Sequence, residues 1–154
     1  MTGDLTILTD LKEGLAKSTP CVLSFFPEEI LITKIDPAKR RKLVEDRKAA
    51  ARKAGEGRMK AALAGFAALT DYAESLRAMD RQAILAEGTE RLARSSVRKL
   101  SFKPAGTRQS VDGLNSAVDE GKLVLKTSDG RLKFTHRLGD SGGRVAAYLA
   151  DFAG

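Results

Sequence analysis

Two hairpin-like patterns, one near each end of the sequence, restrict the folds open to this chain. Near the start, the runs CVLSFF (21–26) and ILITKI (30–35) are rich in β-branched and aromatic residues, and the turn sequence PEE separates them. Near the end, KLVLKT (122–127) and RLKFTHRL (131–138) flank SDG, and an Asp-Gly turn between alternating runs is a strong hairpin signal. Each pattern predicts a pair of antiparallel strands.

The middle of the chain has helical character. Asp36-Pro37 is a typical helix start, because Asp accepts hydrogen bonds from free N–H groups and Pro suits the first turn. The helix continues to 55–57 (GEG), where two glycines either end it or leave a hinge. From Arg58 onward, apolar residues recur every three or four positions and predict a buried stripe. Its members are Met59, Leu63, Phe66, Leu69 or Thr70, Ala73 and Leu76. We expect helix to about Arg94, as one helix or several.

Shorter patterns predict the remaining elements. We expect a short helix over 10–17, a strand over 97–103, a turn at 104–106 and a second short helix over 109–119. A closing helix is predicted over 144–153. Its apolar side consists of Val145, Tyr148, Leu149 and Phe152.

These elements predict an α+β fold. It has a long helical middle segment with short helix-plus-hairpin units at both ends, which form one small antiparallel sheet. The length of 154 residues fits a single domain, 1–154. The basic helical segment 37–60 could project from that domain, with a hinge at 55–57.

Positive charge is unevenly distributed along the chain. Residues 34–60 contain eleven Lys and Arg against four Asp and Glu, so this segment carries the whole net charge of +7. A second stretch, 91–108, contains six basic residues and no acidic one. Clustered Lys and Arg attract polyanions, because neutralised phosphates release their condensed counterions. On a helix the charge of 37–60 would form a collar around the axis, and a collar of this kind can also serve only to keep an exposed helix solvated.

Two functional hypotheses follow. The first is a non-catalytic basic protein that binds nucleic acid mainly through the phosphate backbone, with little sequence specificity. Its candidate nucleic-acid-binding residues are Lys39, Arg40, Arg41, Lys42, Arg47, Lys48, Arg52, Lys53, Arg58, Lys60, Arg94, Arg98 and Lys99. The alternative is a structural or adaptor subunit of a larger phage or bacterial assembly, whose basic collar meets an acidic protein partner or whose helices form a homo-oligomer.

Two local motifs resemble known families without the context that those families need. GDSGG at 139–143 resembles the sequence around the nucleophile of chymotrypsin-like serine proteases, but the chain has one His, His136, and a helical middle. Residues 110–138 resemble the recognition helix and wing of winged-helix domains. The linker before them is too short for the first helix of that motif, and Asp112, Asp119 and Glu120 would face phosphates badly. We therefore expect a structural helix-plus-hairpin unit.

The sequence offers few other residues for disulfides, metal binding or catalysis. The single Cys21 excludes an intramolecular disulfide and Cys-based metal clusters, and it is expected, like His136, to be a packed strand residue. We expect no enzyme activity, no cofactor and no bound metal. There is no apolar run of about 18 residues and no secretory pattern in MTGDLTILTD, so we expect no membrane contact and a cytoplasmic location, or a virion-associated one if the chain is phage-encoded.

Overall fold

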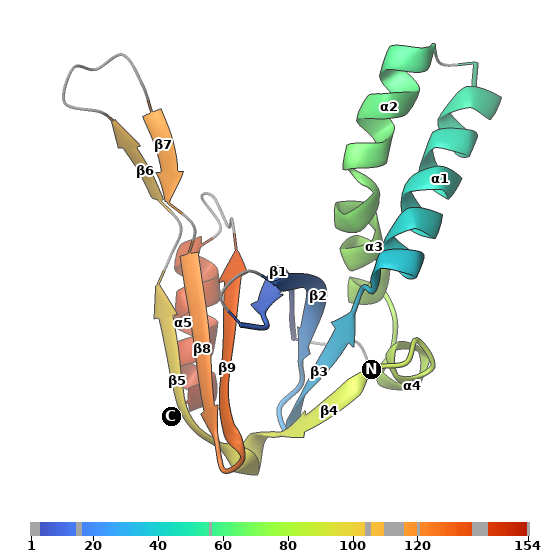
Figure 1. Cartoon of the computed structure of the whole chain (residues 1–154). Helices are drawn as coiled ribbons and strands as arrows, with labels where there is room; N and C mark the ends of the chain where they lie inside the picture. Colours follow the sequence, from blue (N-terminus) through green and yellow to red (C-terminus); the bar gives the residue numbers. More distant parts are fainter. Residues whose placement is uncertain are drawn as a thin grey trace.

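The fold is built on an antiparallel sheet of seven strands. The structure, a computed structural model, describes residues 4–14, 17–55, 57–103, 106–109, 116–119, 121–136 and 142–153. The strand order in the sheet is β4-β3-β2-β1-β9-β8-β5 (Figure 1). Its strands are β1 (Leu5–Lys12), β2 (Ser18–Phe25), β3 (Glu29–Lys34), β4 (Glu90–Ala93), β5 (Val97–Lys103), β8 (Gly121–Thr127) and β9 (Gly130–His136). A separate two-stranded ribbon, β6 (Gly106–Gln109) and β7 (Ser116–Asp119), connects β5 to β8.

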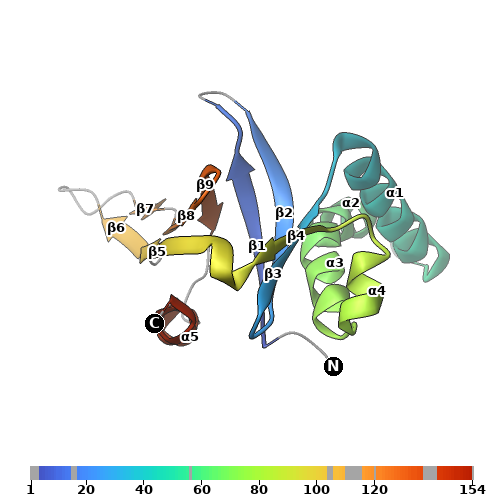
Figure 2. The ribbon, with the colours of Figure 1, turned by 90° about the horizontal axis from the view of Figure 1, so that it is seen from below.

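The sheet bends between β1 and β9. Strands β1 and β2 pair along eight residues, whereas β1 and β9 pair only at Asp10–Thr135 and Leu11–Phe134. Figure 2 shows the half made of β1–β4 at an angle to the half made of β5, β8 and β9. Helix α5 (Gly142–Ala153) packs with residues of both halves, and Phe25 contacts Phe152 edge-to-face at a centroid distance of 5.4 Å. One apolar core therefore joins the two halves.

Helices α3 (Ala68–Arg77) and α4 (Arg81–Leu85) cover the other face of β1–β3. The other helical elements are α1 (Pro37–Lys53), α2 (Arg58–Phe66) and the short 3-10 turn η1 (Arg94–Ser96) between β4 and β5. Tyr72, Leu76 and Ile84 from α3 and α4 pack with Val22 and Leu31 of the sheet in a second core. Helices α1 and α2 run side by side away from the sheet (Figure 1). We call α1 and α2, with the turn between them, the helical hairpin.

The predicted architecture was wrong in its proportions. Helices and strands are both present, as an α+β fold requires, but a seven-stranded sheet with short helices replaces the long helical middle and small sheet. The helix expected over 10–17 is wrong where it can be checked, because 10–12 are the end of β1, where Leu5, Ile7, Thr9 and Leu11 alternate onto one face of a strand. Residues 15–16 lie outside the described residues. The helix expected to reach Arg94 gives way to β4, after Gly88 adopts a φ of 78°.

Two further predictions in the last third were tested only in part. The helix expected over 109–119 is wrong where it can be checked, because 116–119 form strand β7, while 110–115 lie outside the described residues. The turn expected at 104–106 is described only at Gly106, which begins β6. Pairing with a partner strand outweighs local helix preference in this segment.

Several local predictions were confirmed. Both hairpins form as expected, and the strand over 97–103 matches β5. The side chain of Asp36 accepts a hydrogen bond from the Lys39 N–H at 2.7 Å and caps α1. Helix α5 buries the expected side, with Val145, Leu149 and Phe152 buried and Tyr148 packed against the same core.

The predicted buried stripe from Met59 onward is correct only at its end. Ala73 and Leu76 are buried, but Met59 is 80% exposed and Leu63 is 60% exposed. The helix divides at Ala67, so α2 and α3 pack on different surfaces and the stripe is not continuous. Leu69 is half-buried and Thr70 is exposed, and the side chain of Phe66 lies outside the described part of the chain.

Candidate polyanion-binding surface

One face of β5, β8 and β9 is exposed and strongly basic. Alternate side chains of a strand point to opposite faces. On the inner face, Leu123, Leu125 and Phe134 are buried in the core with α5. On the outer face, six basic side chains are exposed. These six residues, which we call the basic strand face, are Lys99, Lys103, Lys122, Lys126, Arg131 and Lys133.

The strand register places these residues in rows across the sheet. Lys99 lies opposite Lys126, and Lys126 lies opposite Arg131, which makes a first row of three. Lys103 lies opposite Lys122 and makes a second row. Between the two rows lies a third row. It contains Ser101, Val124 and Lys133.

The three strands of the basic strand face contain no acidic residue to compensate its charge, but the exposed Asp10 of the neighbouring β1 lies opposite Thr135 at its edge. No acidic residue occurs within β5, β8 or β9, and none of the six side chains forms an ion pair with a described residue. Like charges directly opposite on neighbouring strands are destabilising, by about 0.2–1 kcal/mol for a pair. A row such as Lys99, Lys126 and Arg131 therefore lowers the stability of the isolated chain, and a bound polyanion would relieve that repulsion.

The basic residues predicted on α1 are partly occupied by internal contacts. The ammonium of Lys39 lies 3.3 Å from a Glu87 carboxylate oxygen and 4.6 Å from the centre of the Tyr72 ring. Burial lowers the pKa of Lys39, but its interactions with Tyr72 and Glu87 outweigh this effect and raise the pKa overall. Arg47 pairs with Asp71 at 2.9 Å. These contacts hold α1 against α3 and against the segment that follows α4.

Lys48 is also part of the helix packing. A Cβ added to Gly65 of α2 would lie 2.9 Å from the Lys48 Cε atom, so the aliphatic stem of Lys48 crosses α2 where there is no side chain. Ala51 of α1 and Ala61 of α2 are also buried. Small residues therefore let the two helices approach closely, and Lys48 covers their contact.

The other predicted residues of the helical hairpin are exposed but dispersed around it. They are Arg40, Arg41, Lys42, Arg52, Lys53, Arg58 and Lys60. Arg40 and Arg41 line an open cavity of about 510 Å³ between α1 and the ends of β2 and β3, together with the acidic Glu13 and Glu45. The hairpin thus presents mixed charges around two helices, whereas the basic strand face presents one sign on one surface.

Arg94, Arg98 and Lys99 have different roles, although the sequence grouped them. The Arg94 guanidinium lies 4.7 Å from the centre of the Phe152 ring and donates hydrogen bonds to the Pro27 and Asp151 carbonyl oxygens at 3.1 and 3.3 Å. Arg94 therefore tethers α5 to the sheet. Arg98 is exposed at an irregularity of β5, and Lys99 belongs to the basic strand face.

Four members of the basic strand face were missed from the sequence, and Lys103 was recognised only as part of the basic stretch 91–108. The four are Lys122, Lys126, Arg131 and Lys133. The alternation of basic and apolar residues in KLVLK and RLKF was the available signal, and the two-residue turn before Gly130 sets their register. The pairing of β5 with β8 joins segments separated by β6 and β7, and no local pattern predicts it.

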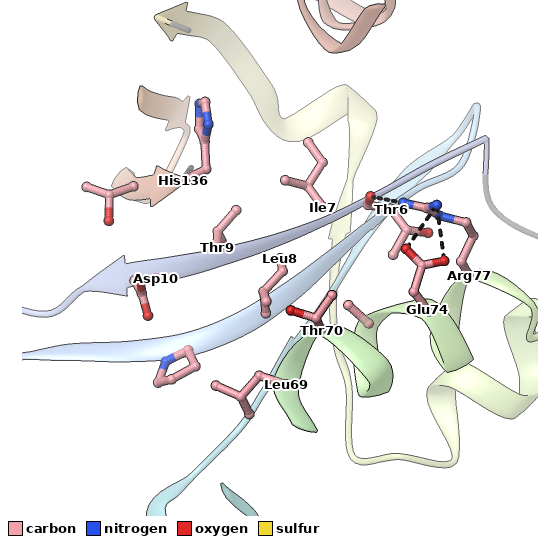
Figure 3. Close-up of a pocket in the computed structure, with 13 residues that line it drawn as sticks. Thr6, Ile7, Leu8, Thr9, Asp10, Leu69, Thr70, Glu74, Arg77 and His136 are labelled. Atoms are coloured by element: carbon pink, nitrogen blue, oxygen red, sulfur yellow. Dashed lines mark hydrogen bonds and ion pairs between the residues drawn. The ribbon is translucent and has the colours of Figure 1, made fainter. Parts of the chain in front are cut away.

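A second cavity, of about 390 Å³, lies between β1 and α3 (Figure 3). In it, Arg77 pairs with Glu74 at 3.1 Å and donates a hydrogen bond to the Thr6 carbonyl oxygen at 3.4 Å. Figure 3 shows the His136 ring directed away from Asp10 and Glu74. This cavity therefore brings together no described base and nucleophile.

His136 and Cys21 are packed residues of the sheet. The His136 ring stacks on Phe102 at a centroid distance of 4.8 Å and fills the space beside Gly121, and burial lowers its pKa. Cys21 is fully buried against Thr9, and burial raises its pKa to about 11. The Cys21 thiol is therefore protonated at neutral pH. Residues 139–141 of the GDSGG motif and residues 110–115 of the winged-helix-like segment lie outside the described part of the chain.

Within the described ranges, no group of three or more His, Cys, Asp and Glu is placed to hold a metal ion. No described helix is both long enough and apolar enough to span a membrane. No protein-family model, curated protein or solved structure matches this chain.

Proposed function

We propose that this chain is a non-catalytic protein that binds nucleic acid through the phosphate backbone, with the basic strand face as the main contact surface. The observation that supports this proposal is the basic strand face itself, where six Lys and Arg share one exposed surface without an acidic neighbour in their strands. Phosphates bound there would release condensed counterions and relieve the repulsion between the basic residues within each row.

The helical hairpin would have a secondary role in this function. Its exposed arginines and lysines add to the positive field of the molecule and would speed the approach of a polyanion. They surround two helices, so few of them could contact one nucleic acid at the same time. Binding that depends on phosphates alone would show little sequence specificity.

The test compares two variants of equal charge change. One carries Lys99→Gln, Lys126→Gln and Arg131→Gln, and the other carries Arg40→Gln, Arg41→Gln and Lys42→Gln on α1. Both are measured by fluorescence anisotropy with a labelled duplex over a series of salt concentrations. We expect the strand variant to lose more than tenfold in affinity and the helix variant to lose only a few-fold.

Two results would contradict the proposal. Absence of binding by the unmodified protein at low salt would exclude nucleic acid as its ligand. An equal loss in the two variants would show that net charge matters and that the basic strand face does not. An acidic polymer without nucleobases, such as heparin, serves as the control for general polyanion binding.

A second candidate function is a structural or adaptor subunit of a phage or bacterial assembly. The observation that favours it is the exposure of Met59 and Leu63 on α2. Each lies two residues from the buried Ala61, so helical geometry directs both away from α1. Sedimentation velocity should then show self-association that Met59→Ser with Leu63→Ser abolishes, or the same variant should lose an acidic partner. A monomer at high concentration would exclude the homo-oligomer.

A further inference from the structure

We infer that the basic strand face binds double-stranded DNA by both of its backbones across one major groove, without stacking on bases. This inference rests on the proposed function and names its ligand more closely. It follows from the spacing of the rows and from the chemistry of the outer face.

The spacing of the two outer rows matches the width of the major groove. Lys99 and Lys103 are four residues apart on β5, and Lys126 and Lys122 are four apart on β8. At about 3.3 Å per residue, the rows lie about 13 Å apart. The major groove of B-form DNA is about 12 Å wide. One row can therefore follow each of the two backbones that border the groove.

The width of the first row fits a contact with successive phosphates. Lys99, Lys126 and Arg131 come from three neighbouring strands, so the row spans about 10 Å at about 4.8 Å per strand. Long flexible lysines and an arginine fork can adjust to phosphates over this length. The second row has two such residues, Lys103 and Lys122. It continues through Thr135 on β9 to Asp10 on β1, so its contact with phosphates is limited to the two lysines.

The side chains of the middle row suit the base edges in a DNA groove, and they include no aromatic ring on which a base could stack. Ser101, Val124 and Lys133 would lie above the base edges, and none of them is aromatic. The aromatic residues of these strands, Phe102 and Phe134, belong to the inner core with α5. Proteins that bind single strands generally stack bases on aromatic side chains. A single strand would therefore gain only charge contacts here, whereas a duplex offers two backbones.

The experiment compares three ligands with a fixed number of phosphates: a DNA duplex, a single DNA strand that does not self-pair, and an RNA duplex. Affinity is measured by fluorescence anisotropy between low and moderate salt. For the five residues of the two rows, we expect a slope of log affinity on log salt of about −4.5 with duplex DNA. We expect the DNA duplex to bind at least tenfold more tightly than the single strand or the RNA duplex, whose major groove is narrow.

Variants of the two rows test the contact with both backbones. Lys99→Gln with Lys126→Gln and Arg131→Gln removes the first row, and Lys103→Gln with Lys122→Gln removes the second. Each should make the slope shallower, by about 2.7 and about 1.8 respectively, and each should abolish the preference for duplex DNA. Arg40→Gln with Arg41→Gln is the control for the second row, and circular dichroism verifies the fold of every variant.

The outcomes separate this inference from the proposed function. If no nucleic acid binds at low salt, both are wrong. If the single strand or the RNA duplex binds as tightly as duplex DNA, the proposed function stands and the inference is overturned. Retention of the duplex preference after loss of either row would also overturn it, because contact with one backbone would then be sufficient.

Discussion

The helical hairpin and the basic strand face concentrate positive charge in two different ways. In α1 the basic residues are close in sequence, but each step along a helix rotates the side chain by about 100°. In β5, β8 and β9 they come from two separate segments, 99–103 and 122–133, and alternation and register bring six of them to one face. Density of charge along a sequence is therefore a poor guide to density of charge on a surface.

The helical hairpin and the basic strand face also differ in how far acidic residues compensate their positive charge. On the hairpin side, Lys39 and Arg47 have acidic partners on neighbouring elements, and Lys48 packs along Gly65. The basic strand face has no acidic residue within its strands, and an apolar core supports it from behind. This difference can be tested at four residues. Phe134 and Gly121 probe the packing of the core behind the basic strand face, His136 probes its response to pH, and Lys126 probes the charge of the face itself.

Removal of Phe134 should have the largest effect on stability. Phe134 is 1% exposed and lies in the core under the basic strand face. Phe134→Ala should lower the free energy of unfolding by about 3–5 kcal/mol, as cavity-forming changes in cores do. Chemical denaturation measures this loss. Phe134→Leu is the control and should cost much less. A loss below 1 kcal/mol for Phe134→Ala would mean that this half of the sheet is loosely packed.

A methyl group at Gly121 should have the next largest effect. A Cβ at this position would overlap the Cε1 atom of His136, so the imidazole must move. Gly121→Ala should cost about 1–3 kcal/mol, the usual range for overpacking. In a His136→Ala background the same change should cost clearly less, because the ring is gone. Equal costs in the two backgrounds, measured by denaturation as a double-mutant cycle, would contradict this contact.

These two positions also show how far the sequence could predict the structure. The hairpins, the Asp36 cap and helix α5 follow from local patterns of turns, caps and periodicity, and they form as expected. The bend of the sheet and the pairing of β5 with β8 depend on contacts between distant segments. Gly121 shows this limit: its role comes from the ring of His136 on the facing strand, which the local sequence does not reveal.

The stability of the protein should fall in mildly acidic solution because of His136. Burial lowers the pKa of His136 in the folded state below its ordinary value of about 6.5. The unfolded chain therefore binds the proton more readily, and stability decreases as the pH falls below about 6.5, until the folded-state pKa is passed. Denaturation between pH 7.5 and pH 5 measures this decrease. His136→Phe should flatten the profile, and an unchanged profile in that variant would assign the effect to other groups.

Reversal of one charge in the first row should have the smallest effect on stability, which should rise slightly. The same change should weaken the binding of duplex DNA. Lys126 lies between Lys99 and Arg131, so Lys126→Glu replaces two repulsions with two attractions. The free energy of unfolding should rise by about 0.5–1 kcal/mol, while affinity for duplex DNA falls more than tenfold.

The matched control for this reversal is Lys42→Glu on α1. There the new carboxylate would attract Lys39 three residues before it but would repel Glu45 and Asp46, three and four residues after it. Its stability should change by only a few tenths of a kcal/mol, and its affinity for duplex DNA by a few-fold at most. Lower stability of Lys126→Glu would show that the three side chains of the first row are too far apart to repel one another. In that case the basic strand face would carry its charge at no cost to the fold, and relief of repulsion would add nothing to the binding of DNA.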